Sequence, residues 1–290
     1  MSPELSTTVS KIDRAQLVQM ALELAKREDL GDRGDITTEA IVEKSRQAKA
    51  TVLCKEEAVI AGLAVFASVL QSFDQSIKVT ALIKEGQRVT SIPSPILQVE
   101  GPARAILTGE RLALNLLQRM SGIASVTSQY VALASPYGIS IRDTRKTTPG
   151  LRVFEKEAVA LAGGENHRFG LFDAILIKDN HIEIAGGIEA AIAAARGAAP
   201  GMAVQAEAAT IEQVRQAVAA GVDGILLDNM APAMVAQAVQ VINGACFVEV
   251  SGGININNLK NYLIEGVNAI SVGALTHSAP NIDISLEVQI

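Results

Sequence analysis

The chain has 290 residues, a formal net charge of −6 at pH 7 and only 3% aromatic residues. This length can supply the cores of two domains, and we expect two. The acidic balance and the scarcity of stacking aromatics exclude a protein that coats nucleic acid.

The N-terminal residues lack the basic, apolar and small-residue order of a signal peptide. The longest apolar run, Ala58–Leu70, is too short to cross a bilayer. We therefore expect a soluble, cytoplasmic protein without a membrane partner. Cys54 and Cys246 are far apart and lack metal-ligand spacing, so we expect reduced core thiols.

The first 115 residues combine helices with short alternating strands. A helix is expected from Ser10, with Asp13 three residues on as in a capping box, until Gly31 and Gly34 end it. The residues expected to face the core are Leu17, Val18, Met20, Ala21 and Leu24. Strands are predicted at residues 49–55, 77–84 and 95–99, and the Glu-Gly and Gly-Pro turns between them favour an antiparallel sheet. A long helix should follow from about Ala103 to Tyr130, although Gly109 and Gly122 are unfavourable inside a helix.

After residue 135 the pattern changes to short apolar strands that alternate with helices. Strands are predicted at residues 139–143, 174–178, 203–207, 224–228, 246–250 and 268–272. Apolar strands that alternate with helices predict a parallel sheet, and their spacing of roughly 20 to 35 residues suits a barrel. The predicted fold class is α/β, with an incomplete, TIM-like α/β barrel.

Polar residues stand at the carboxyl ends of these strands, where an α/β barrel carries its chemistry. They are Asp143, Lys178, Glu207, Asp228 and the Ser251-Gly252-Gly253 turn. Taken singly, Asp228 also fits a helix cap and Glu207 an ion pair with a neighbouring arginine. The coincidence of all of them on one edge favours an active site.

The segment 141–181 is basic within an acidic protein, which points to an anionic ligand. Its cationic residues include Arg142, Arg145, Lys146, Arg152, His167, Arg168 and Lys178. Arginine forks bind planar carboxylates bidentately, and the two acids can hold Mg²⁺ against a pyrophosphate or face a cationic centre. The glycine turns at 251–255 and 272–276 let backbone N–H groups approach a phosphate. This layout is expected for transfer of phosphoribose to an acidic ring.

Several long motifs carry a resemblance to one family. They are DTRKTTPGLR at 143–152, AGGENHRFGLFDAILIKDNHI at 162–182 and ILLDNM at 225–230. EDLGDRGDITTEAI, ERLALNLLQRMSGIAS, VEVSGGI and ISVGALTHSAP extend the match over nearly the whole chain. With these motifs the chain resembles quinolinate phosphoribosyltransferase, the carboxylating nicotinate-nucleotide pyrophosphorylase.

The resemblance implies an N-terminal α/β sandwich domain over residues 1–115, to which a tail of about 277–290 returns, and a barrel over 116–276. It implies transfer of phosphoribose from phosphoribosyl pyrophosphate to quinolinate with decarboxylation, in de novo NAD biosynthesis. The products are nicotinate mononucleotide, pyrophosphate and CO₂. It also implies a homodimer, or a hexamer of dimers, whose active site is shared between subunits.

The resemblance assigns the site residues as well. For quinolinate these are Arg145, His167, Arg168 and Lys178, with Thr144 nearby and Arg111 from the neighbouring subunit. For phosphoribosyl pyrophosphate they are Lys146, Glu207, Asp228, Ser251, Gly252, Gly253, Gly273 and His277. The expected catalytic residues are Lys146, Glu207 and Asp228, of which Glu207 and Asp228 also hold Mg²⁺. Two departures from the family pattern are Gln205, where a second acid is usual, and Ala162, where a glycine is often present.

Two other interpretations stay open. A lysine at a barrel strand end, such as Lys178, can form a Schiff base, which indicates a class of aldolase. A sensor or a related barrel protein of transport operons would keep the pocket for another anion. For the acidic turn EDLGDRGD we expect helix termination.

Overall fold

The computed structural model describes residues 13–289, which fall into two compact units built from segments distant in sequence. One unit contains residues 13–128, 147–163 and those from 275 onward. The other contains residues 129–146 and 164–274. The helix start expected at Ser10 lies outside the described residues.

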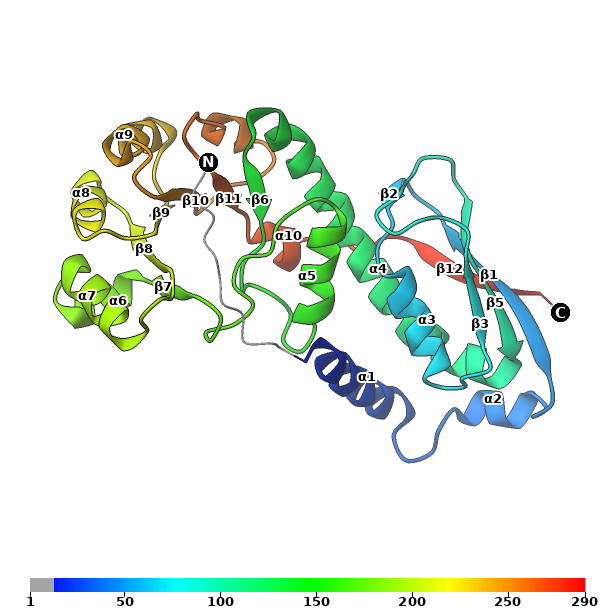
Figure 1. The fold of residues 1–290 in the computed structure, drawn as a ribbon. Helices are drawn as coiled ribbons and strands as arrows, with labels where there is room; N and C mark the ends of the chain where they lie inside the picture. The colour runs from blue at the N-terminus through cyan, green and yellow to red at the C-terminus, as the bar shows by residue number, and fades with distance from the viewer. Residues whose placement is uncertain (1–12, 290) are drawn as a thin grey trace. The chain divides into compact units, whose positions relative to one another are not determined.

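The first unit is built on an antiparallel sheet in the order β12-β1-β5-β3, as the alternating strands predict (Figure 1). Its strands are β1 (Gln47–Cys54), β3 (Lys78–Ala81), β5 (Ser94–Pro102) and β12 (Ile284–Gln289), and β2 (Ala58–Val59) pairs separately with β4 (Arg88–Val89). Strand β12, from the end of the chain, pairs with β1 from Lys49 opposite Gln289 to Cys54 opposite Ile284. Residues 284–289 therefore form an edge strand of this sheet.

The helices of this unit are α1 (Arg14–Leu30), α2 (Ile36–Ile41), α3 (Leu63–Gln71), α5 (Arg152–Leu161), α10 (Ala274–His277) and most of α4 (Ala103–Ala134). Helix α3 buries its apolar face, including Phe66 and Leu70. The predicted long helix is found as α4, which is continuous over 32 residues.

Helix α1 corrects one prediction. Asp13 is its N-cap residue and accepts a hydrogen bond from the backbone N of Gln16 at 3.1 Å. Met20 and Leu24, predicted to face the core, are 58% and 68% exposed, and Leu22 is the buried residue of the helix. The helix contacts α5, and the fold buries fewer of its apolar side chains than the pattern predicts.

The acidic turn after α1 ends this helix, as predicted, and it also begins the next helix. Gly31 closes α1 with a φ of +50°. Asp35 caps α2 by accepting from the backbone N of Thr38 at 2.9 Å, and it also accepts from Oγ1 of Thr108 at 3.1 Å. These hydrogen bonds, first those from Thr38, hold the pKa of Asp35 below its usual value.

Gly122 is required inside α4 because a neighbouring backbone approaches it closely. A Cβ at this position would lie 1.8 Å from the carbonyl oxygen of Pro280. We expect Gly122→Ala to lower the free energy of unfolding by about 1–3 kcal/mol or more, because the added carbon overpacks the helix. The matched control is Gly197→Ala in another helix, where a Cβ would meet nothing within 4 Å. Thermal midpoints compare the two, and an unchanged midpoint in Gly122→Ala would contradict the observed contact.

The second unit is a parallel sheet in the order β6-β11-β10-β9-β8-β7. The strands are β6 (Ser140–Arg142), β7 (Ile175–Ile177), β8 (Val204–Ala208), β9 (Gly224–Asp228), β10 (Phe247–Ser251) and β11 (Ala269–Ser271). All six predicted strands are therefore found. Within the described residues the end strands β6 and β7 are not paired with each other, so the barrel is incomplete as expected.

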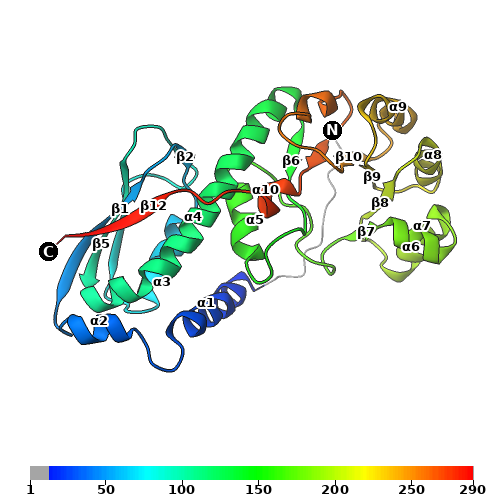
Figure 2. The ribbon, with the colours of Figure 1, turned by 180° about the vertical axis from the view of Figure 1, so that it is seen from behind.

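Helices connect these parallel strands. They are α6 (Asp179–Ala185), α7 (Ile188–Ala198), α8 (Ile211–Ala219) and α9 (Pro232–Ile242), with a 3₁₀ helix at Leu259–Tyr262. Another 3₁₀ helix, Ser135–Tyr137, precedes β6. In both views α7, α8 and α9 lie along the outside of strands β7 to β10 (Figures 1 and 2). Every strand therefore ends in a loop at the same edge of the sheet.

Both cysteines are buried free thiols, as predicted. Burial raises the pKa of the Cys246 thiol to about 11, so it stays protonated at neutral pH. Between residues 13 and 289, no helix has both the length and the apolar character that a membrane span needs.

Candidate active site

Polar side chains gather at the carboxyl ends of the parallel strands. Glu207 of β8 precedes Ala208, and it lies opposite Leu226 of β9, which is two residues before Asp228. Because alternate residues of a strand share a face, Glu207 and Asp228 project from the same face of the sheet. Ser251 lies opposite Asp228 in β10. Two acids and a hydroxyl are therefore neighbours on one edge.

Lys178, which follows β7, reaches Glu207 on the next strand. Its Nζ lies 2.5 Å from Oε1 of Glu207, and the two side chains are 45% and 12% exposed. Glu207 is thus ion-paired with a lysine instead of the arginine considered from the sequence. Asp228 accepts from Nδ2 of Asn229 at 2.8 Å, and the N-cap residue of α9 is Ala231, so the interpretation of Asp228 as a helix cap is wrong.

The segment 165–168 lies beside β6 and brings two predicted ligands to this strand. The backbone N of Glu165 donates to the carbonyl of Ile141 at 2.8 Å, and its carbonyl accepts from the N of Asp143 at 3.2 Å. The buried carboxylate of Asp143 accepts from the backbone N of His167 at 2.9 Å. His167 and Arg168 are therefore anchored at the end of β6.

Arg145 lies near enough to Arg168 for the two charges to act on each other, and one donor of this cationic pair is unsatisfied. Burial, and then the charge of Arg145, lower the pKa of Arg168, while Asp173 and Glu207 raise it. Arg168 donates from Nη1 to the carbonyl of Ala174 at 3.1 Å. The Nε of Arg145 is buried and has no hydrogen-bond partner in the described part of the chain. Two neighbouring guanidiniums with a free donor are suited to bind an anion.

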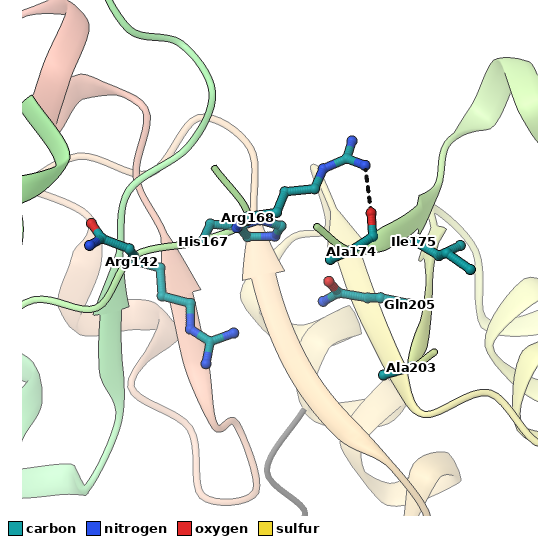
Figure 3. Close-up of a pocket in the computed structure, with 8 residues that line it drawn as sticks. Arg142, His167, Arg168, Ala174, Ile175, Ala203 and Gln205 are labelled. Carbon is teal, nitrogen blue, oxygen red and sulfur yellow. Dashed lines mark hydrogen bonds between the residues drawn. The ribbon is translucent and has the colours of Figure 1, made fainter. Parts of the chain in front are cut away.

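A pocket of about 110 Å³ opens in the same unit. It is lined by Arg142, Asn166, His167, Arg168, Ala174, Ile175, Ala203 and Gln205. Figure 3 shows the side chains of Arg142 and Arg168 extending in opposite directions, with His167 between them. Because Arg142 is paired with Glu165 and Glu249, Arg168 is the arginine of this pocket that is better placed to attract an anion.

Asp173 shapes the loop that carries Arg168, although the sequence analysis did not single it out. Its buried carboxylate accepts from the backbone N of Phe169 at 2.5 Å and of Gly170 at 2.8 Å. A lone acid in a loop is an ambiguous signal in a sequence, because such residues are mostly exposed. The sequence signal that could have identified Asp173 is its position, five residues after Arg168 and directly before an apolar strand.

The glycine turn after β10 is closely packed. Gly252 has a φ of +97°, and a Cβ there would lie 2.3 Å from Oδ1 of Asn229. Gly253 has a φ of +63° and open space around it. A side chain at 252 is therefore excluded, and the backbone of this turn is accessible. Gly273 directly precedes α10 after β11.

The remaining predicted residues are spread over both units. Thr144 accepts from the backbone N of Lys146 at 3.0 Å through its hydroxyl, and Lys146 is exposed. Arg111 is exposed on α4, and His277 is exposed with Nδ1 2.7 Å from Oγ of Ser278. Arg111 and His277 belong to the unit with the antiparallel sheet. The parallel-sheet unit therefore contains every other residue of the predicted site.

Among the residues that the structure describes, no group of three or more His, Cys, Asp or Glu side chains could hold a metal ion. Glu207 and Asp228 nevertheless provide two carboxylates on one face of the sheet. Mg²⁺ is commonly bound by one or two carboxylates together with substrate phosphates, and this donor set fits that mode.

Comparisons with known proteins agree with this architecture. The family model "Quinolinate phosphoribosyl transferase, N-terminal domain" matches residues 35–121, and the model of the C-terminal domain matches residues 123–287. A Bacillus subtilis protein described as a probable nicotinate-nucleotide pyrophosphorylase (carboxylating) is 42% identical over 262 residues, which cover 90% of each chain. The chloroplastic nicotinate-nucleotide pyrophosphorylase (carboxylating) of Arabidopsis thaliana is 38% identical, covering 93% of this chain and 82% of its own. The crystal structure of NadC from Streptococcus pyogenes has a TM-score of 0.90 at 41% identity, covering 97% of this chain and 99% of its own.

Proposed function

The chain belongs to the quinolinate phosphoribosyltransferase family, and on this basis we propose that it transfers phosphoribose from phosphoribosyl pyrophosphate to quinolinate with decarboxylation. The products are nicotinate mononucleotide, pyrophosphate and CO₂, which makes the protein a pentosyltransferase of de novo NAD biosynthesis. The observation in this chain that best supports the proposal is the cationic pair of Arg145 and Arg168, with its buried and unsatisfied Nε.

Quinolinate brings two carboxylates on adjacent ring carbons, and the cationic side of the site suits them. Arg145 and Arg168 relieve their mutual repulsion when an anion binds between them. An unsatisfied buried donor costs about 1–3 kcal/mol, which a bound carboxylate would offset. Lys178 adds a third cation at the end of β7, while Thr144 and His167 are proposed to complete the contacts.

Phosphoribosyl pyrophosphate is proposed to bind along the acidic side. The turn of Gly252 and Gly253 can offer backbone N–H groups to the 5′-phosphate, next to the hydroxyl of Ser251. The other proposed ligands are Lys146, Glu207, Asp228, Gly273 and His277.

The chemistry follows from these charges. Loss of pyrophosphate from C1 of the ribose leaves an oxocarbenium-like centre, which the carboxylates of Glu207 and Asp228 stabilise. The pyridine nitrogen of quinolinate attacks this centre and becomes positively charged. The adjacent carboxylate then leaves as CO₂, because the carbanion beside a cationic nitrogen is largely self-stabilised. A proton from solvent then completes the C–H bond of the product at this ring carbon. The protein mainly positions the two substrates and neutralises their charges.

Mg²⁺ is proposed as the cofactor, held by Glu207 and Asp228 together with substrate oxygens. When bound, it would neutralise the charge of the departing pyrophosphate. A homodimer or a hexamer of dimers in the cytoplasm is proposed, with Arg111 supplied by the neighbouring subunit. Its exposed position on α4 is compatible with this role.

Arg168→Ala is expected to raise the Kd of quinolinate at least about tenfold, because a charge-assisted hydrogen bond contributes about 1.5–3 kcal/mol. Titration calorimetry with quinolinate measures the loss, and nicotinate, which lacks the second carboxylate, is the comparison ligand. The matched control is Arg196→Ala, because Arg196 pairs with Asp223 before the start of β9, away from the strand ends. Unchanged quinolinate affinity in Arg168→Ala would remove Arg168 from the site.

The alternative of a Schiff-base enzyme has less support. A Schiff-base lysine must present a free amine to a carbonyl, whereas Lys178 is ion-paired with Glu207. That alternative also leaves the arginine pair without a role.

A further inference from the structure

Glu249 is a fully buried carboxylate in the middle of β10, with 0% of its surface exposed. It lies opposite Leu226 of β9, which in turn lies opposite Glu207 of β8. Residues directly opposite each other in a parallel sheet point to one face, so Glu249 and Glu207 share that face. Burial of a carboxylate is costly unless it is paired and hydrogen-bonded.

The carboxylate of Glu249 is contacted by four segments. Gln205 donates from Nε2 to Oε2 at 2.9 Å, and Nη1 of Arg142 lies 3.5 Å from the same oxygen. Ser271 donates from Oγ to Oε1, and Nε2 of His167 lies 3.4 Å from Oε1. Arg142, Gln205 and Ser271 belong to strands of the parallel sheet. The fourth partner, His167, belongs to the segment that carries Arg168.

The imidazole of His167 is held on its other side as well. Its Nδ1 accepts a hydrogen bond from the backbone N of Arg168 at 2.7 Å. Because Nδ1 is an acceptor, the ring proton is assigned to Nε2, which faces Glu249. The ring therefore links Glu249 to the backbone N of Arg168.

We propose that Glu249 is a positioning residue for the carboxylate-binding side of the site, acting through the imidazole of His167 on the placement of Arg168. This inference rests on the proposed function, in which Arg168 is a quinolinate ligand. A change at Glu249 should therefore alter the affinity for quinolinate and not that for phosphoribosyl pyrophosphate. In the proposed binding mode, phosphoribosyl pyrophosphate contacts neither His167 nor Arg168.

Gln205, one of the two departures from the family pattern, makes a sharp test possible. In Glu249→Gln, the charge beside His167 is lost, and two amide groups meet at positions 205 and 249. In the double variant Gln205→Glu/Glu249→Gln, the hydrogen bond between these positions is restored in the reverse direction. The single carboxylate then stands at position 205, and the new amide at position 249 separates it from His167.

Quinolinate affinity, the KM for phosphoribosyl pyrophosphate and the thermal midpoint are measured for each protein. We expect the Kd of quinolinate to rise about tenfold in Glu249→Gln and to stay raised in the double variant, because the charge-assisted contact is missing in both. The KM for phosphoribosyl pyrophosphate should stay within about twofold in both, and the thermal midpoint of the double variant should return toward the parent. Ser271→Ala removes another hydrogen bond to Glu249 but keeps the carboxylate beside His167, and it should bind quinolinate within about threefold of the parent.

Two outcomes would overturn the inference while leaving the proposed function intact. One is parent-like quinolinate affinity in Glu249→Gln. The other is recovery of quinolinate affinity in the double variant, which would show that Glu249 only stabilises the sheet. A parent protein that does not bind quinolinate would overturn the proposed function itself, and the inference with it.

Discussion

Replacing Asp228 with asparagine is expected to lower kcat about a thousandfold while the Kd of quinolinate stays within about threefold. A charge at ~4 Å in an effective dielectric of about 20 contributes up to ~4 kcal/mol, which corresponds to roughly that factor in rate. Asp228 is the better of the two acids for this test, because Glu207 is also ion-paired with Lys178. Asparagine keeps the shape of the side chain and removes the charge.

Pre-steady-state and steady-state rates of pyrophosphate release measure this change. Asp223→Asn is the matched control, since Asp223 precedes the same strand at its opposite end and bonds to Arg196 and the backbone of Val204. We expect the control to retain kcat within about threefold. A kcat for Asp228→Asn within a few-fold of the parent would remove this residue from the catalytic machinery.

Glu155→Ala is expected to lower the free energy of unfolding by about 3–5 kcal/mol, the usual effect of removing one partner of a buried ion pair. Glu155 is fully buried, and its Oε1 accepts from Nε and Nη2 of Arg119 at 3.1 and 3.0 Å. Its carboxylate also accepts from the backbone N and the hydroxyl of Thr148 at 3.1 and 2.8 Å. Arg119 in turn donates to the carbonyls of Ala279 and Thr276. Loss of the carboxylate would therefore leave a largely buried guanidinium without its counter-charge.

Thermal and urea unfolding measure the loss of stability. Glu157→Ala on the same helix is the matched control, because Glu157 pairs with Arg14 at the surface, where the side chains are 34% and 61% exposed. Exposed pairs contribute about 0–1 kcal/mol, so the control should unfold close to the parent. Equal midpoints for the two variants would show that the buried network is not needed for stability.

The sequence was sufficient to predict the strands of the parallel sheet and the edge of that sheet at which the polar residues gather. Strands buried on both faces are continuous apolar runs, so β7 to β10 were visible as such, and the residues that end them were visible too. The buried face of helix α1 could not be predicted in this way. Its apolar residues form a wide stripe, and only the tertiary packing of the helix determines that Leu22 is covered while Met20 and Leu24 are exposed.

The network around Glu249 was missed for a different reason. Its partners Arg142, His167, Gln205 and Ser271 are far apart in the sequence, and only the fold brings them together. The available signal was one acid inside the apolar strand FVEV, which occurs in the motif VEVSGGI. A pattern of basic residues indicates that the ligand is an anion, but it does not identify the ring. Quinolinate was therefore predicted from the family motifs and not from the basic residues.

The most direct test of the central claim measures CO₂ and pyrophosphate together, from the purified protein incubated with phosphoribosyl pyrophosphate, Mg²⁺ and quinolinate, with nicotinate as the control acid. Equal release of both products that depends on quinolinate is expected. Release of pyrophosphate with nicotinate alone, or no turnover with either acid, would contradict it and favour a related protein that binds a different anion in the same pocket.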